Sequence, residues 1–194
     1  LNLEKYDEWK DDPDMISDVM RFLDNVLSDF INKAPEQFKD AKYSAERERS
    51  VGLGVMGFHS FLQKHRIPLE SVMAKSWNKK IFKQIDEQVN QASKDLAEER
   101  GACPDAAEYG FQERFSNKTA IAPTASISII CGGASPGVEP IAANSYTHKT
   151  LSGSFNVRNR YLEEILESHG KNDDETWSTI TTNQGSVSHL DFLT

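Results

Sequence analysis

Hydrophobic residues recur every three or four positions along much of the chain, which is the spacing of one face of an α-helix. Asp12 followed by Pro13 is a frequent helix start, and Gly101 is a typical helix stop. Helices are therefore predicted over four stretches: residues 13–33, a long segment from 70 or 76 to 100, residues 159–170 and residues 174–183.

Residues 50–64 carry the same helical spacing, but three glycines interrupt it. Gly52, Gly54 and Gly57 form a GxGxxG pattern, which in dinucleotide-binding proteins follows a buried strand. The preceding residues, ERERS, are too polar for such a strand. A helix over residues 50–64 is therefore the preferred interpretation, with the glycines admitting a neighbouring backbone. The charged residues before it predict a solvated loop or helix face, with pairing of Arg47 or Arg49 to an acidic segment as the alternative.

A different pattern occupies residues 116–140. Residues 119–122 read as a short strand, Pro123 ends it, and hydroxyl side chains and glycines follow. The hydroxyls belong to Thr124, Ser126 and Ser128. Hydroxyl groups and bare backbone amides bind anions, and the pattern therefore predicts a phosphate site. A buried strand with a glycine-rich turn and no ligand remains the alternative, because glycine mostly serves turns.

The polar segment after Pro140 leaves two interpretations open. Asn144, Tyr146, His148 and Lys149 follow the hydroxyl-rich turn closely enough to reach a ligand there, or they form an ordinary polar loop. Together these patterns predict a helix-rich α/β fold in which a single strand needs partners from outside these residues. The unfinished apolar pattern at residues 187–193 favours a segment of a longer or split chain.

The composition restricts the function further. The chain has 194 residues, a net charge of −8 and 38% hydrophobic residues, which suits one domain with a real core. The acidic balance argues against nucleic-acid binding, and neither a membrane span nor a signal peptide is visible. Cys103 and Cys131 have no metal-ligand spacing, and so few thiols suit a reducing cytoplasm.

Several blocks of the sequence resemble the large catalytic subunits of class I ribonucleotide reductases. They are ERERSVGLGVMGFHSFLQ, SWNKKIFKQI, LAEERGACPDA and PTASISIICGGASPGVEP with IAANSYTHKTLSGSF after it. The resemblance covers residues 1–194 and implies one partial domain, a segment of the family's ten-stranded α/β barrel. These enzymes reduce ribonucleoside diphosphates to deoxyribonucleoside diphosphates for DNA synthesis.

The resemblance also implies which residues bind substrate. In the family, amides and hydroxyls after a barrel strand hold the substrate diphosphate. The matching positions here are Pro123, Thr124, Ala125, Ser126 and Ile127, with Ser128 beside them.

Other family features match nothing in this sequence. The radical-bearing cysteine, the reducing cysteine pair, the radical-relaying tyrosines and the ATP and deoxynucleotide effector sites all lie elsewhere in relatives. No catalytic residue, metal or bound cofactor is therefore expected here, and the chain alone is expected to be inactive. The implied partners are the rest of the large subunit, a second large subunit and a small subunit that supplies the radical, all in the cytoplasm.

Overall fold

The computed structural model describes residues 1–150 and 153–193, and the side chains of residues 148–150 lie outside the description. The chain forms two compact units, Leu1–Glu139 and Pro140–Thr194. Each unit has its own packing and is described by itself.

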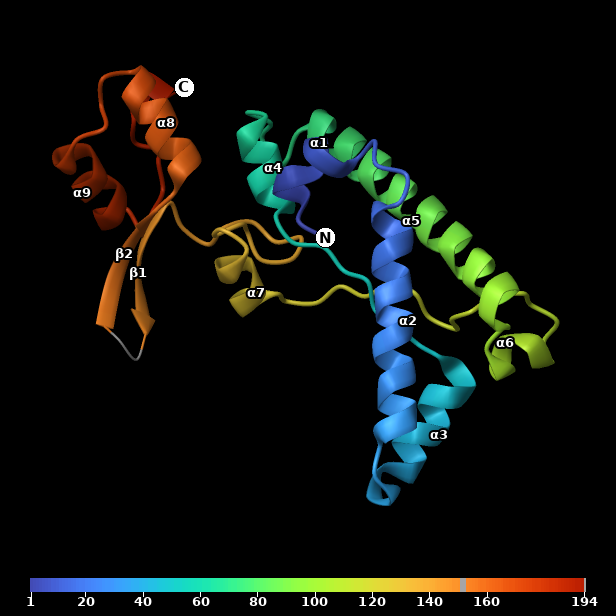
Figure 1. Cartoon of the computed structure of the whole chain (residues 1–194). Coiled ribbons are helices and arrows are strands. Elements are labelled where there is room, and N and C mark those ends of the chain that lie inside the picture. Colours follow the sequence, from blue (N-terminus) through green and yellow to red (C-terminus); the bar gives the residue numbers. More distant parts are fainter. Residues whose placement is uncertain (151–152, 194) are drawn as a thin grey trace. The chain divides into compact units, whose positions relative to one another are not determined.

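Helices make up most of the first unit (Figure 1). They are α1 (Tyr6–Trp9), α2 (Met15–Lys33), α3 (Lys39–Glu48), α4 (Phe58–Lys64), α5 (Val72–Arg100), α6 (Pro104–Glu108) and α7 (Ala125–Ile130), with 3₁₀ turns η1 (Leu3–Lys5) and η2 (Glu36–Phe38). The predicted helices over residues 13–33 and up to residue 100 are confirmed by α2 and α5. Helix α2 begins two residues late because Asp12 Oδ1 accepts the N–H of Asp14 at 3.0 Å, which caps a turn ahead of the helix.

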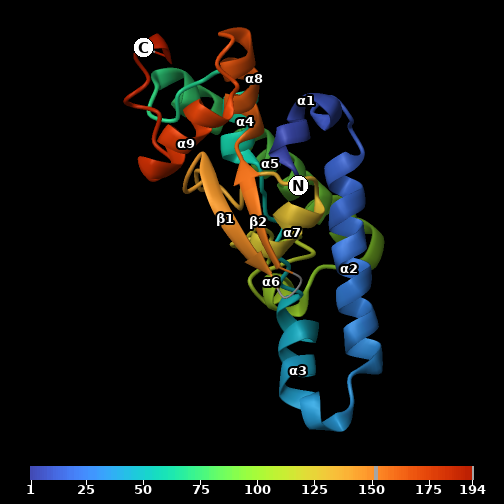
Figure 2. The same ribbon diagram turned by 90° about the vertical axis from the view of Figure 1, so that its left-hand side faces the viewer.

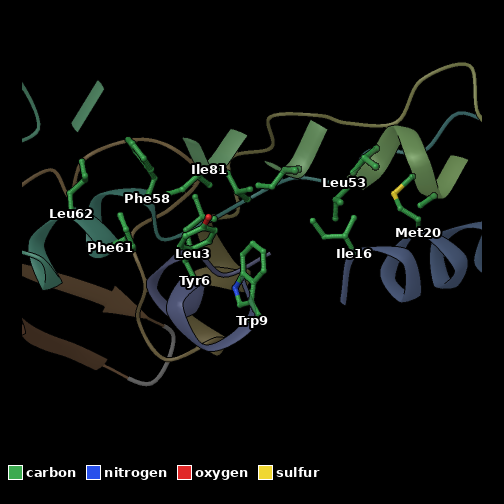
Figure 3. Packing of buried hydrophobic residues seen from close by; sticks show 14 of the residues in the cluster. Leu3, Tyr6, Trp9, Ile16, Met20, Leu53, Phe58, Phe61, Leu62 and Ile81 are labelled. Carbon is green, nitrogen blue, oxygen red and sulfur yellow. The ribbon is translucent and has the colours of Figure 1, made fainter. Parts of the chain in front are cut away.

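The core of this unit lies where α2, α4 and α5 meet the chain's first residues. Tyr6 packs edge-on against Trp9 and Phe61, with ring centroids 5.1 and 5.7 Å apart. Figure 3 shows Ile16 and Met20 of α2 facing Leu53. The regular apolar spacing of α2 and α5 thus produces the face that the sequence predicts, and burial of that face stabilises both helices.

Residues 50–56 lie outside any helix and α4 begins only at Phe58, so the helix predicted over residues 50–64 is wrong in its first half. The backbone N–H groups of Val51 and Leu53 donate to the carbonyls of Asn117 and Lys118, at 2.9 and 3.0 Å. Leu53 and Thr119 form an isolated parallel bridge. The strand predicted over residues 119–122 is likewise reduced to this bridge. The close backbone approach predicted at the glycines is confirmed, since a Cβ on Gly54 would lie 2.7 Å from the carbonyl oxygen of Ala120.

The charged stretch before residue 50 forms the solvated helix α3, which runs back alongside α2 (Figures 1 and 2). Its arginines find acidic partners within this chain. Arg47 pairs with Asp105 and Glu108, both in α6. Arg49 ends the helix in a left-handed conformation, φ 46°, and its guanidinium reaches buried Asp24.

The second unit contains a hairpin and two helices (Figure 2). Strands β1 (Ser145–Thr150) and β2 (Gly153–Arg158) pair antiparallel, with Ser145 opposite Arg158. The polar-loop interpretation is therefore wrong here. The described side chains of β2 are mostly exposed, so buried and exposed positions do not alternate clearly along this strand. The side chains of His148 and Lys149, which the sequence places near a ligand, lie outside the described residues.

Helices α8 (Arg160–Ser168) and α9 (Asp174–Thr182) confirm the two predicted C-terminal helices. They pack with the 3₁₀ turn η3 (Asp191–Leu193) around a small apolar cluster of buried residues. Its buried members are Leu162, Leu166, Trp177, Ile180 and Leu190. Asn144 donates to the carbonyl of Gly185 at 2.9 Å and accepts from Asn159 at 2.7 Å, which makes it a structural residue of this unit.

Candidate functional site

The residues predicted to bind an anion form a sharp turn into α7, here named the Thr124 turn (residues 123–128). Thr124 is the residue before the helix and has φ 51°, a left-handed conformation that residues other than glycine rarely adopt. Two hydrogen bonds hold it there. Its carbonyl accepts the N–H of Ser128 at 2.9 Å, and its Oγ1 accepts the N–H of Gly137 at 2.7 Å.

The turn presents most of the predicted residues to the surface. Pro123, Ala125, Ser126 and Ile127 are exposed, and Thr124 is half-buried. The first N–H groups of a helix have no partner within the helix and carry partial positive charge. Backbone donors from Ala125, Ser126 and Ile127 therefore lie in the same exposed turn as the Ser126 hydroxyl.

Ser128 differs from the other predicted residues. Its side chain is buried, with 2% of the residue exposed, and its hydroxyl donates to the carbonyl of Ala125 at 3.2 Å. It braces the first turn of α7 from within.

A second segment, here named the glycine loop (residues 132–137), folds back against the Thr124 turn. Gly132, Gly133 and Gly137 all have positive φ, and the N–H of Gly133 donates to the carbonyl of Ser128 at 3.0 Å. A Cβ on Gly137 would lie 3.1 Å from the carbonyl oxygen of Ala122. Glycine is needed at this last position both for its φ and for the close approach.

The glycine loop is held from the other side by a pair of buried serines that the sequence did not single out. Ser60 of α4 and Ser135 of the loop each donate a backbone N–H to the other's hydroxyl, at 3.1 and 2.8 Å. The N–H of Gly57 donates to the carbonyl of Ser135 at 2.7 Å. The two serines are 75 positions apart in the sequence, so no local pattern signals their pairing.

The electrostatics of the turn suit a neutral set of donors. Residues 119–138 contain no Asp, Glu, Lys, Arg or His, so the donors that the turn itself supplies are uncharged hydroxyl and backbone N–H groups. Cys131 is exposed beside the glycine loop and Cys103 is buried, while burial lowers the pKa of His59. Within the described part of the chain, no group of His, Cys, Asp and Glu could hold a metal ion. Nor does any helix there have the length and apolar character to cross a membrane.

Comparison with known proteins identifies the fold. The family model "Ribonucleotide reductase, barrel domain" matches residues 1–113 and 104–194. The large subunit of a ribonucleoside-diphosphate reductase from Invertebrate iridescent virus 6 is 48% identical over 98% of this chain. The solved class Id ribonucleotide reductase alpha subunit of Actinobacillus ureae superposes with a TM-score of 0.89 over the whole chain, at 38% identity.

These relatives are much longer than this chain, which spans 20% of the viral protein and 35% of the bacterial chain. The relatives include a class I enzyme and a vitamin B12-dependent enzyme. A vitamin B12-dependent ribonucleoside-diphosphate reductase of Thermoplasma acidophilum is 39% identical over 79% of this chain and 21% of its own length. The predicted fold, a helix-rich segment of the barrel, is confirmed, and the two family-model matches together cover all of its residues. The chain belongs to the ribonucleotide reductase barrel-domain family.

Proposed function

We propose that this chain is part of a ribonucleoside-diphosphate reductase large subunit in which the Thr124 turn binds the substrate diphosphate. The observation that carries the proposal is the run of neutral donors at half-buried Thr124 and exposed Ala125, Ser126 and Ile127, with no charged side chain in residues 119–138. Pro123 sets the turn, and Ser128 supports it from within.

The chemistry of this turn is binding and orientation. A diphosphate has many acceptor oxygens, and backbone N–H groups at a helix start, together with two hydroxyls, donate to several of them at once. Fixing the charged tail holds the ribose where chemistry takes place, which is a large part of catalysis. No catalytic residue is assigned to these 194 residues.

The remaining parts of the function follow the same proposal. The two compact units form one partial barrel domain, since the family model spans both. The enzyme is of class I: a small subunit supplies the radical, the large subunit pairs with a second copy, and ATP and deoxynucleotide effectors bind outside this segment. The enzyme acts in the cytoplasm.

The isolated chain is proposed to be inactive and a weak binder of diphosphates. It spans 20% to 35% of its longer relatives, and α7 leaves Ile127, Ile129 and Ile130 more than half exposed. Such apolar side chains next to the donors require covering segments, and a turn that must still be ordered loses affinity.

The test uses the complete reductase assembly that contains this chain. Ser126→Ala removes one exposed hydroxyl and leaves the backbone in place, so KM for CDP should rise about 3- to 10-fold with little change in kcat, as for one lost hydrogen bond. Thr124→Val should act in the same direction. Ser76→Ala, an exposed serine on α5, is the matched control and should leave KM unchanged.

Two outcomes contradict the proposal. Unchanged KM in both variants would make the chain an assembly segment without substrate contacts. Tight binding of CDP by the isolated chain in calorimetry would make it a stand-alone nucleotide binder.

A further inference from the structure

The pairing of Ser60 with Ser135 is reciprocal: both side chains are buried, and each hydroxyl accepts the other residue's backbone N–H. Ser60 is 0% exposed and Ser135 is 1% exposed. The two N···O distances are 3.1 and 2.8 Å, so neither bond is marginal. A buried hydrogen-bonded pair of this kind fixes two segments relative to each other, because breaking it leaves buried N–H groups without acceptors.

The pair connects to the Thr124 turn through a short series of contacts. Ser135 lies two residues before Gly137, and the N–H of Gly137 donates to Thr124 Oγ1 at 2.7 Å. Gly57, at the start of the helix that carries Ser60, donates its N–H to the carbonyl of Ser135 at 2.7 Å. Helix α4 therefore sets the position of the glycine loop, and the loop sets the hydroxyl of Thr124.

The last contact determines what the Thr124 hydroxyl can do. A hydroxyl has one hydrogen and two acceptor lone pairs. Because one lone pair accepts the N–H of Gly137, the hydrogen of Thr124 remains free to donate to a ligand at the exposed side of the turn. A displaced Gly137 would release this hydroxyl to rotate, and binding would then carry the cost of ordering it.

We propose that Ser60 and Ser135 are positioning residues for diphosphate binding, acting through Gly137 on the hydroxyl of Thr124. This inference rests on the proposed function of the Thr124 turn. It assigns to α4, a helix with no residue in that turn, a part in substrate affinity. Neither serine touches substrate.

The experiment measures steady-state kinetics of the complete reductase assembly with Ser60→Ala and Ser135→Ala, each removing one acceptor of the pair. KM for CDP and the inhibition constant of inorganic pyrophosphate should both rise about 3- to 10-fold, with little change in kcat. Ser60→Cys, which keeps a weak acceptor, should recover part of the affinity. Melting temperatures of all variants are measured in parallel, with Ser76→Ala as the control.

A double-mutant cycle separates positioning from plain loss of stability. If Ser135 acts through the Thr124 hydroxyl, Thr124→Val should raise KM about 5-fold in the parent and less than about 2-fold in the Ser135→Ala background. If Ser135 has a purely structural role, the KM of the double variant should rise by the product of the two single-variant fold-changes. Multiplying effects, or lowered melting temperatures with unchanged KM and inhibition constant, would overturn the inference.

The inference and the proposed function fail differently. If Thr124→Val and Ser126→Ala leave KM unchanged, the turn does not bind diphosphate and the proposed function fails. If they raise KM while both serine variants keep the parental KM, only the positioning role is refuted. Should Ser60→Ala prevent assembly, Ser135→Ala applies the same test from the loop side.

Discussion

Replacement of Asp24 by asparagine should destabilise the first unit more than any other single charge removal on α2. Asp24 is fully buried and accepts hydrogen bonds from three arginines. Arg49 and Arg114 donate to Oδ1 at 2.6 and 2.9 Å, and Arg100 donates to Oδ2 at 2.8 Å. The carboxylate thereby joins α2 to the end of α3, the end of α5 and the segment that follows α6.

The size of the effect follows from the exposure of the three partners. The side chains of Arg49 and Arg114 are 10% and 11% exposed, so Asp24→Asn leaves two nearly buried guanidiniums without a counter-charge. Removal of one partner of a buried ion pair costs about 3–5 kcal/mol. Arg100 is 27% exposed and also donates to Asn25 Oδ1 at 2.7 Å, so losing its bond to Asp24 costs less. We therefore expect the free energy of unfolding to fall by about 3 kcal/mol, the lower end of that range.

Urea unfolding followed by circular dichroism measures this loss. With an m-value of about 1–3 kcal/mol per molar, the midpoint should fall by about 1–3 M. Asp29→Asn is the control, because Asp29 lies on the same helix in an exposed pair with Lys33 at 2.7 Å and should change stability by less than about 0.5 kcal/mol. Equal losses for the two variants would refute the reasoning.

The pH dependence gives a second check on the same residue. Burial pushes the pKa of Asp24 up, but hydrogen bonds from Arg114, Arg100 and Arg49 outweigh it and hold the pKa below its ordinary value. A carboxylate with a lowered folded-state pKa stabilises the fold above its unfolded value of about 3.9, and this stability is lost as the pH falls through the folded-state pKa. The difference between parent and Asp24→Asn should therefore shrink below about pH 4.

Two further predictions concern the same unit. Gly54→Ala should cost about 1–3 kcal/mol in urea unfolding, because its Cβ would lie 2.7 Å from a backbone oxygen that cannot move aside. Gly132→Ala, where the space is open and only the positive φ opposes alanine, should cost about 1 kcal/mol, and a larger loss there would contradict the steric argument. Glu99 should titrate near pH 2 in NMR, because the hydrogen bond from Arg21 lowers the pKa to about 2, and Arg21→Ala should return it toward about 4.3. A Glu99 titration that Arg21→Ala leaves unmoved would exclude that cause.

The helices were predictable because their buried apolar residues recur at a regular spacing. Apolar residues at every third or fourth position indicate a helix whatever segment packs against it, and α2, α5, α8 and α9 all lie where this spacing predicts them. Residues 50–56 carry the same spacing yet form no helix, because the N–H groups of Val51, Leu53 and Met56 bond to carbonyls more than 50 residues away. The hairpin over residues 145–158 was not predicted, because its strands are mostly exposed. Without a buried face, apolar and polar residues do not alternate clearly along them.

The candidate site divides along the same line. Residue types alone brought out Thr124, Ser126 and Ser128, because hydroxyls beside glycines are chemically distinctive in any fold. Their different roles were not readable, since only the three-dimensional structure turns Ser128 inward onto Ala125 and leaves Ser126 exposed.

The roles of Ser60 and Ser135, which hold the glycine loop, could not be predicted from the sequence for a further reason. Each is a common residue in an ordinary local setting, and the hydrogen bonds between them exist only after α4 and the loop have met. Groups that touch a ligand leave a chemical signature in the sequence, whereas groups that hold those groups in place leave a signature only in the fold. The affinity of the Thr124 turn should therefore depend as strongly on Ser60, whose local sequence carries no signal of this role, as on the hydroxyl groups that the turn exposes.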